Sequence, residues 1–115
     1  MVLGALLCAS SVLIGAFGAH LLKTILIENG RTDTFNTAMN YLIFHSLAVL
    51  IAGITLKNAK VIAGLFVLGI LFFSGSLIAL SLTNLTFFGA LAPMGGLSFM
   101  IGWLRLTYAI SKTAY

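Results

Sequence analysis

The sequence predicts an all-α membrane protein, a compact antiparallel bundle of four transmembrane helices in which residues 1–115 form a single domain. Two observations lead to this prediction. Of the 115 residues, 61% are hydrophobic and only 7% are charged, whereas an ordinary soluble domain has about 25% charged residues. The apolar residues also lie in four stretches of about 20 residues, the length that crosses a bilayer as a helix. A soluble enzyme and a disordered chain are therefore excluded.

The four spans are predicted at residues 2–22, 34–56, 60–82 and 91–111. Inside a bilayer no water is present to pair with backbone amides, so an apolar stretch of this length must be a helix. The alternation of polar and apolar residues that is typical of a membrane β-strand is absent from these stretches.

The connecting segments indicate how the spans are joined. Residues 23–33 contain the turn-forming pair Asn29-Gly30, and Asp33 is a suitable N-cap for the second helix. Residues 57–60 are so few that the second and third helices must form an antiparallel hairpin. Residues 83–90 are apolar and are expected to lie in the membrane interface. Pro93 is expected in the first turn of the fourth helix, where its missing N–H costs nothing.

The charged residues predict the orientation. The net charge of +4 does not indicate nucleic-acid binding, because the cations are scattered at the ends of the spans. Cytoplasmic loops of membrane proteins carry the excess of Lys and Arg. On the side of both termini lie Lys57, Lys60, Arg105 and Lys112, and on the other side lie Lys23 and Arg31. We therefore predict a multi-pass protein of the bacterial inner (plasma) membrane with both termini in the cytoplasm.

Small residues predict which helix faces meet. Helices in a bilayer associate by close packing, so small residues mark surfaces that face protein. The glycines expected at helix contacts are Gly4, Gly15, Gly18, Gly75, Gly95 and Gly102. Helix one carries small residues on two faces, one of which could serve a second copy. The expected partners are the lipid bilayer and, beyond it, other membrane proteins or a second copy, but not nucleic acid.

A group of polar residues within the spans forms a candidate pocket. Its members are His20, Asn40, Tyr41, His45, Ser74 and Ser76. The antiparallel topology places His20 and His45 in the same half of the bilayer, and an ionisable residue there is a functional hypothesis. Three interpretations remain open: hydrogen bonds between helices, a pocket for a small molecule, lipid or quinone, and a pair of haem or metal ligands. Two histidines without a neighbouring Cys or carboxylate are a weak metal signal, so we predict no metal site and no cofactor.

No catalytic residue is predicted. His45 could act as a base toward Ser74 or Ser76, but no span contains a carboxylate that would orient it. Arg105 has a stem long enough to reach the nearby interface. Arg105 and Trp103 are therefore expected to anchor the fourth helix at the membrane surface, and attraction of a substrate is the alternative role for Arg105.

Several motifs resemble those of a known family. They are Gly15-Ala16-Phe17-Gly18-Ala19-His20, Thr37-Ala38-Met39-Asn40-Tyr41 followed by Phe44-His45, Phe73-Ser74-Gly75-Ser76, Pro93-Met94-Gly95-Gly96 and Gly102-Trp103. In this order and spacing the chain resembles the bacterial inner-membrane proteins of unknown function related to transmembrane protein 256. One departure is Phe35, where the family pattern has Trp. The resemblance implies four membrane helices and a plasma-membrane location, implies no activity, and singles out His20, Tyr41 and His45.

The sequence thus predicts an integral plasma-membrane protein of unknown biochemical activity. The leading hypothesis is a non-enzymatic accessory or scaffold component, because small-residue seams are dense and no catalytic constellation is present. One alternative is small-molecule, lipid or quinone binding or transport through the polar pocket around His20 and His45. A second alternative is a haem-binding or metal-binding redox subunit.

Overall fold

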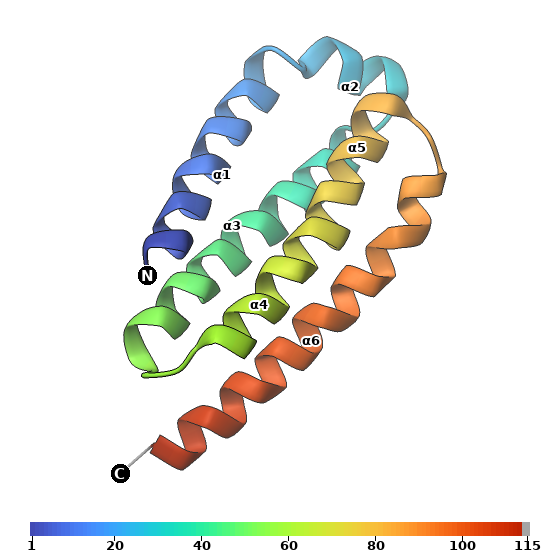
Figure 1. The fold of residues 1–115 in the computed structure, drawn as a ribbon. Coiled ribbons are helices and arrows are strands. Elements are labelled where there is room, and N and C mark those ends of the chain that lie inside the picture. The colour runs from blue at the N-terminus through green and yellow to red at the C-terminus, as the bar shows by residue number, and fades with distance from the viewer. Residues whose placement is uncertain (114–115) are drawn as a thin grey trace.

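The computed structural model describes residues 1–113, which form helices joined by short turns (Figure 1). The elements are α1 (Val2–His20), α2 (Lys23–Asn29), α3 (Thr32–Thr55), α4 (Lys60–Gly69), the π-helix η1 (Ile70–Gly75), α5 (Ser76–Thr83) and α6 (Phe87–Thr113). Because α4, η1 and α5 follow one another without a break, they form one span. Within the described residues, four helices are long and apolar enough to cross a membrane. The predicted fold class is confirmed.

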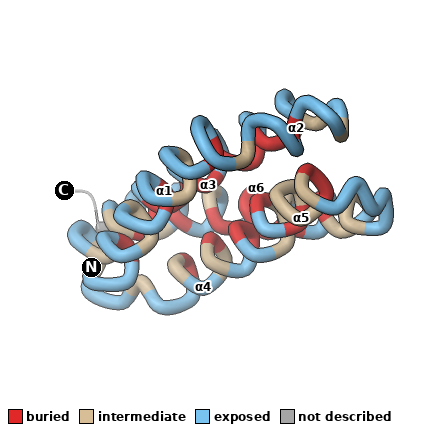
Figure 2. The backbone as a smooth tube through the Cα atoms, turned by 90° about the horizontal axis from the view of Figure 1, so that it is seen from above, coloured by how far each residue is buried: buried red, intermediate tan, exposed pale blue. Residues whose placement is uncertain are grey.

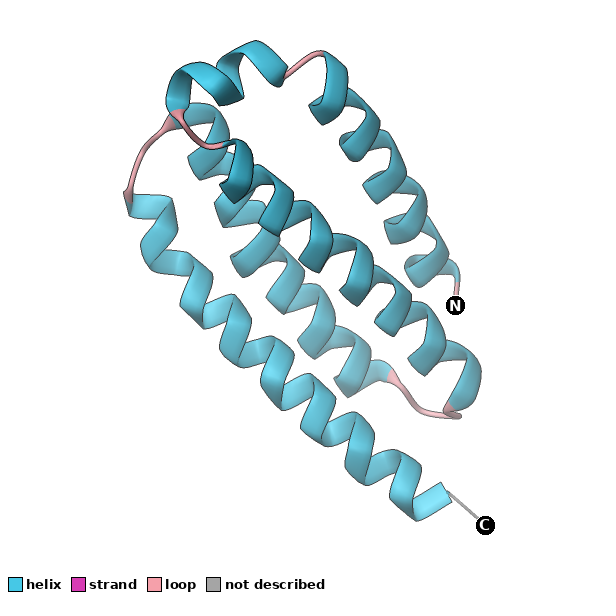
Figure 3. Cartoon of the chain, turned by 180° about the vertical axis from the view of Figure 1, so that it is seen from behind, coloured by secondary structure: helices cyan, strands magenta, loops and turns pink. Residues whose placement is uncertain are grey.

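The spans run alternately up and down, and their connections lie at the two ends of the molecule (Figure 3). The first and last described residues therefore lie at the same end (Figure 1). Each span packs mainly against the next span in the chain: α1 against α3, α3 against the α4–η1–α5 span, and that span against α6. The molecule measures 52 × 26 × 16 Å along its principal axes.

Helix α3 is the most enclosed of the spans, whereas α1 has exposed residues along most of its length (Figure 2). Helix α3 lies between α1 and the α4–η1–α5 span, so two of its faces are covered. Its buried residues include Phe35, Leu42 and Val49. This central position makes α3 the element on which a polar site can be shielded.

The first connection differs from the prediction, because residues 23–29 form the short helix α2 rather than an irregular segment. Leu26 on this helix is buried against the bundle, and helix formation pairs the backbone groups next to lipid. Gly30 ends α2 with a positive φ of 65°, as expected for the predicted turn. Asp33 is not the N-cap of α3. Arg31 occupies that position, and Asp33 lies in the first turn, where a carboxylate favours the positive end of the helix.

Two side chains fix α2 and the start of α3 to the end of α5. The Asn29 amide donates to the carbonyl oxygens of Ser81 and Leu82 at 3.0 and 3.3 Å. The Arg31 Nε donates to Asn84 Oδ1 at 2.9 Å. The bonds from Asn29 satisfy two carbonyl groups in the last turn of α5, which have no partner within that helix.

The start of the fourth span also differs from the prediction. Helix α6 begins at Phe87, so Pro93 lies inside it rather than in its first turn. Proline removes one hydrogen bond, the one that would reach the Gly89 carbonyl. Pro93 is exposed and close to the helix end, where a freed carbonyl lies near the membrane interface. The apolar Phe87 and Phe88 extend the helix because a helix is the backbone form that lipid tolerates.

Most of the predicted packing glycines lie at close helix contacts. A Cβ added at Gly4 would lie 2.5 Å from the backbone N of Leu50, and one at Gly18 would overlap the Phe35 ring. These two positions seat α1 on α3, and Gly15 between them has looser contact, with Met39 Cε at 3.5 Å from its added Cβ.

The α4–η1–α5 span meets α6 at another set of glycines. An added Cβ at Gly95 would overlap the backbone N of Phe73, and one at Gly102 would lie 2.8 Å from the Phe66 ring. Gly75 is not a packing position, because it is exposed while Ser74 and Ser76 on either side turn inward. Gly69 makes the close contact on this span, against Phe99 and the Gly95 carbonyl.

Candidate functional site

A groove of about 610 Å³ lies between α3 and α6, near the middle of both helices, with η1 contributing to its wall. Its lining is mostly aromatic, and Tyr41, Phe44 and Met100 are exposed, so the groove opens toward the outside of the bundle. In a membrane this opening would face the acyl chains. The lining residues are Asn40, Tyr41, Phe44, His45, Phe73, Gly96, Phe99, Met100 and Trp103.

His45 and Trp103 form a hydrogen bond across the groove. The indole Nε1 of Trp103 lies 3.0 Å from Nε2 of His45, and Nδ1 of His45 lies 2.8 Å from the Tyr41 carbonyl oxygen. An indole N–H can only donate and a carbonyl oxygen can only accept. His45 is therefore neutral with its proton on Nδ1, which donates to Tyr41, while Nε2 accepts from Trp103.

The His45 ring is also enclosed by aromatic rings. It is 3% exposed and stacks on Phe99 with ring centroids 3.5 Å apart and an interplanar angle of 11°. Phe66 lies 5.7 Å away, and Tyr41 stacks more loosely at 5.9 Å. The imidazole is thus held by rings as well as by both of its nitrogens, and its orientation is fixed.

The π-helix η1 places Phe73 at the groove. A single π-helical turn within an α-helix is rare and often lies at a functional site. Phe73 contacts the Tyr41 ring at 4.5 Å and the Phe99 ring at 5.8 Å between centroids. Close approach of the backbone at Gly95 brings α6 against this turn. The irregular turn and the glycine together set the separation between η1 and α6.

Three of the six residues predicted for the polar pocket lie together in the groove: Asn40, Tyr41 and His45. Ser74 and Ser76 are buried but do not line it, and the Ser74 hydroxyl has no hydrogen-bond partner in the described part of the chain. The structure does not bring His20 to this site.

His20 is exposed at the end of α1. Gly4, Ser11 and Gly18 form the buried face of α1. A residue two positions after Gly18 is turned by about 200° around the helix, because successive residues are separated by about 100°. His20 therefore points away from α3, and the two histidines are not neighbours.

Trp103 was expected as an interfacial anchor, but its indole turns inward to His45 and completes the groove. Sequence reasoning also did not assign Phe73 or Phe99 to the site. A usable signal existed for Trp103: an indole near the middle of a 27-residue helix is too deep for the interface and needs a hydrogen-bond acceptor. Arg105, the other expected anchor, is exposed and lies outside the groove, in the C-terminal half of α6.

The groove retains unused hydrogen-bonding groups. The side chains of Asn40 and Tyr41 are exposed at its edge, and within the described residues neither forms a hydrogen bond to a protein atom. They supply two N–H donors and one O–H donor to a molecule in the groove. His45 cannot serve a metal ion in this arrangement, because its unprotonated nitrogen is already occupied by Trp103. The site is thus chemically suited to non-covalent binding of a largely apolar molecule.

The fold and the groove define a small integral membrane protein with a mostly aromatic groove between two of its spans. The comparisons identify its family. Residues 14–96 match the family model described as "Protein of unknown function (DUF423)", and the chain belongs to this family. The resemblance to the family of transmembrane protein 256 is thereby confirmed.

Relatives in other bacteria share nearly the whole chain. A UPF0382 membrane protein of Staphylococcus haemolyticus is 40% identical over 97% of this chain and 94% of its own length. One from Bacillus subtilis is 32% identical over 97% and 95% of the two chains, and one from Haemophilus influenzae is 37% identical over 89% and 85%. All three are named as membrane proteins without an activity. No solved structure matches the chain.

Proposed function

We propose that this protein is a non-enzymatic membrane protein that binds a lipid-soluble molecule in the groove between α3 and α6. The molecule we infer has a flat conjugated ring with a carbonyl acceptor, as a quinone has, and an apolar tail. The observation that carries this proposal is the aromatic groove, which lies at the depth of the acyl chains and keeps unused donors on Asn40 and Tyr41.

The chemistry of the lining supports this choice of molecule. The rings of Tyr41, Phe73 and Phe99 offer faces and edges to a flat ring, and such contacts contribute beyond the area they bury. A carbonyl oxygen on that ring would accept from the Tyr41 hydroxyl or the Asn40 amide. A non-enzymatic role is supported by His45, whose two nitrogens are both engaged in hydrogen bonds and are not free to exchange a proton.

The single tryptophan of the chain makes the proposal testable. Trp103 lines the groove, so a quinone bound there should quench its fluorescence. We expect saturable quenching when decylubiquinone is titrated into the protein in a mild detergent. The variant Tyr41→Phe should bind about fivefold more weakly, the equivalent of one lost hydrogen bond of about 1 kcal/mol.

Tyr108→Phe is the matched control, because Tyr108 is also on the bundle surface but lies outside the groove. It should bind decylubiquinone as the unmodified protein does. Quenching that rises in proportion to quinone without saturation, and equally in both variants, would show only partitioning of the quinone into the micelle and would contradict the proposal.

A scaffold role is the second candidate, and the exposure of α1 favours it. This helix packs mainly against α3, with a smaller contact to α2, and it exposes the small residues Ala5, Ala9 and Ala16. Helices associate in bilayers through such faces. Contact with a second copy or another membrane protein would be detected as a cross-link from a cysteine introduced at Ala9, made in a chain whose natural Cys8 is replaced by Ser.

For orientation, we propose a bacterial plasma-membrane location with both termini in the cytoplasm. The unequal distribution of Lys and Arg supports it. Lys57, Lys60 and Lys112 lie at the end that holds the termini, as does Arg105, whereas Lys23 and Arg31 lie at the other end. Cytoplasmic segments carry the excess of these residues.

A further inference from the structure

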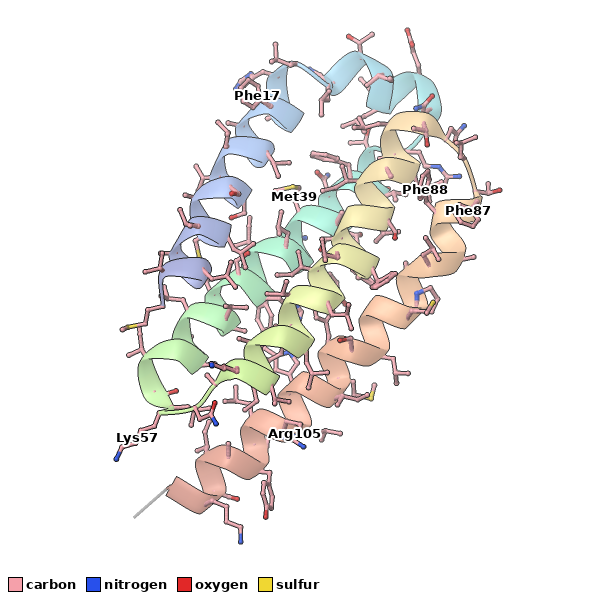
Figure 4. All side chains as sticks on the ribbon, viewed as in Figure 1. Phe17, Met39, Lys57, Phe87, Phe88 and Arg105 are labelled. Atoms are coloured by element: carbon pink, nitrogen blue, oxygen red, sulfur yellow. The ribbon has the colours of Figure 1, made fainter. Side chains whose placement is uncertain are left out.

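A second cavity lies at the end of the molecule that holds Met1 and the last described residues. It has a volume of about 780 Å³ and lies between the α3–α4 turn and the C-terminal part of α6. Figure 4 shows Lys57 at this turn and Arg105 on α6, both at this end of the molecule. None of the residues that line it lines the groove, so it is a separate feature.

The cavity is strongly basic. Lys57, Arg105 and Lys112 all line it. The chain has two acidic residues, and both, Glu28 and Asp33, lie at the opposite end, in α2 and the first turn of α3. Within residues 1–113 these three cations therefore have no carboxylate side chain to pair with, and Lys112 Nζ lies over the Tyr108 ring, 5.4 Å from its centroid.

The other lining groups are of two kinds. Asn58 adds amide donors near the cations, whereas Val61 and Ile62 make one side apolar. The Thr55 hydroxyl also lines the cavity, but it already donates to the Ile51 carbonyl oxygen at 2.8 Å. Lys57 in the α3–α4 turn and Lys112 in the last turn of α6 would lie at the level of lipid headgroups, and the long stem of Arg105 would reach toward that level from inside the span. The apolar part would then lie toward the acyl chains. A ligand that fits both parts carries negatively charged oxygens at one end and hydrocarbon at the other.

We propose that this basic cavity binds the phosphate of an anionic phospholipid. The Arg105 guanidinium presents paired N–H donors that match phosphate oxygens, and Lys57 and Lys112 add charge at its rim. Basic pockets between membrane helices are a recognised form of lipid headgroup site. Val61 and Ile62 would contact the start of an acyl chain. This binding does not depend on the function proposed for the groove.

The test uses lipids labelled with bromine, which quenches tryptophan fluorescence at short range. Trp103 is two residues from Arg105 and is the only tryptophan. The protein is placed in vesicles of phosphatidylcholine and phosphatidylglycerol in fixed proportion, with bromine on the chains of one lipid or the other. We expect stronger quenching when phosphatidylglycerol carries the bromine, because that lipid is concentrated at the cavity.

The double variant Arg105→Gln/Lys112→Gln should lower the preference for phosphatidylglycerol by about tenfold or more, since each cation near a membrane contributes roughly fivefold. Lys60→Gln is the matched control, because it removes a cation from the same end but does not line the cavity. It should keep the preference. Circular dichroism confirms that each variant is folded before it is compared.

Two results would overturn the proposal. If Lys60→Gln lowers the preference as much as either cavity substitution made singly, the effect is general surface attraction and not a site. If the unmodified protein is quenched no more by brominated phosphatidylglycerol than by brominated phosphatidylcholine, that lipid is not concentrated at the cavity and the lipid assignment is wrong. Inorganic phosphate competes for the same cations, so we expect it to lower the preference more than sodium chloride at equal ionic strength, which acts by screening alone.

Discussion

The pair formed by His45 and Trp103 is the most informative residue-scale feature of the site. Each side chain is the hydrogen-bond partner of the other, at a depth where an unpaired polar group would lower stability. Removing one member leaves the other unpaired, whereas removing both leaves an apolar contact between rings. The bond therefore contributes most to stability through the penalty that it prevents.

A double-mutant cycle measures this coupling. We expect Trp103→Phe and His45→Phe each to lower the free energy of unfolding in detergent, by about 1–2 kcal/mol. The double variant should lose less than the sum of the two, with a coupling energy of about 0.6 kcal/mol or more, the average for hydrogen bonds between membrane helices. Because Trp103 is removed, unfolding is followed by circular dichroism. Strictly additive losses would mean that the bond contributes nothing.

Part of the site could be predicted from the residues alone. Asn40, Tyr41 and His45 recur at helical spacing on one face of a single helix, so their proximity follows from local geometry. Whether Trp103 lines the groove and His20 does not depends on the rotational orientation of each helix about its own axis. Small residues on two faces of helix one left that rotation undetermined, whereas the structure selects the face with Gly4, Ser11 and Gly18.

At the scale of elements, apolar length predicted the four spans, and irregularities within them went undetected. The π-turn at Ile70–Gly75 leaves no break in hydropathy, since it differs from a regular helix only in backbone pairing. Helix α2 lies in the polar connection between two spans, and its seven residues are too few for a hydropathy pattern to distinguish a helix from a loop. Pro93 was read as the start of a helix, but the Phe87–Phe88 pair before it extends α6. The preference of proline for the first turn of a helix was overridden by the requirement that backbone groups in lipid be hydrogen-bonded.

The close contact between α6 and η1 leads to a prediction about glycine. In Gly95→Ala the added methyl would meet the backbone of Phe73 and the Gly69 carbonyl. Backbone atoms cannot move aside as a flexible side chain does, so we expect a loss of about 1–3 kcal/mol in the free energy of unfolding. A larger separation between α6 and η1 would also change the shape of the groove, since Gly96 and Phe73 line it.

Gly64→Ala is the control on the same pair of spans, because no atom lies within 4 Å of its added Cβ. There the usual advantage of alanine over glycine in a helix applies, up to about 1 kcal/mol. Thermal unfolding in detergent compares the two variants. A Gly95→Ala protein as stable as Gly64→Ala would contradict the close packing of α6 on η1.

At the scale of the whole molecule, the alternating spans predict which turns share a compartment. Asn58 lies in the turn at the end that holds the termini, and Asn84 lies in the turn at the opposite end. With Cys8, the only cysteine, replaced by Ser, we expect Asn84→Cys to react with a membrane-impermeant maleimide added outside cells. Asn58→Cys should react only after the membrane is made permeable.

Two other labelling patterns of Asn58→Cys and Asn84→Cys would contradict different parts of this prediction. A reversed pattern would keep the four-span topology and overturn the proposed orientation. Labelling of both positions from the same side would contradict the topology itself. Expression and folding of both variants are checked by labelling after detergent solubilisation.

The arrangement of the spans also has a consequence for biosynthesis. Since spans that are adjacent in the chain pack on one another, each new helix that leaves the translocon finds a partner already in the bilayer. Contacts that link neighbours in the chain close short loops, which favours rapid folding. Assembly can therefore proceed during translation. The groove is completed last, when α6 inserts and Trp103 forms its hydrogen bond with His45 on α3.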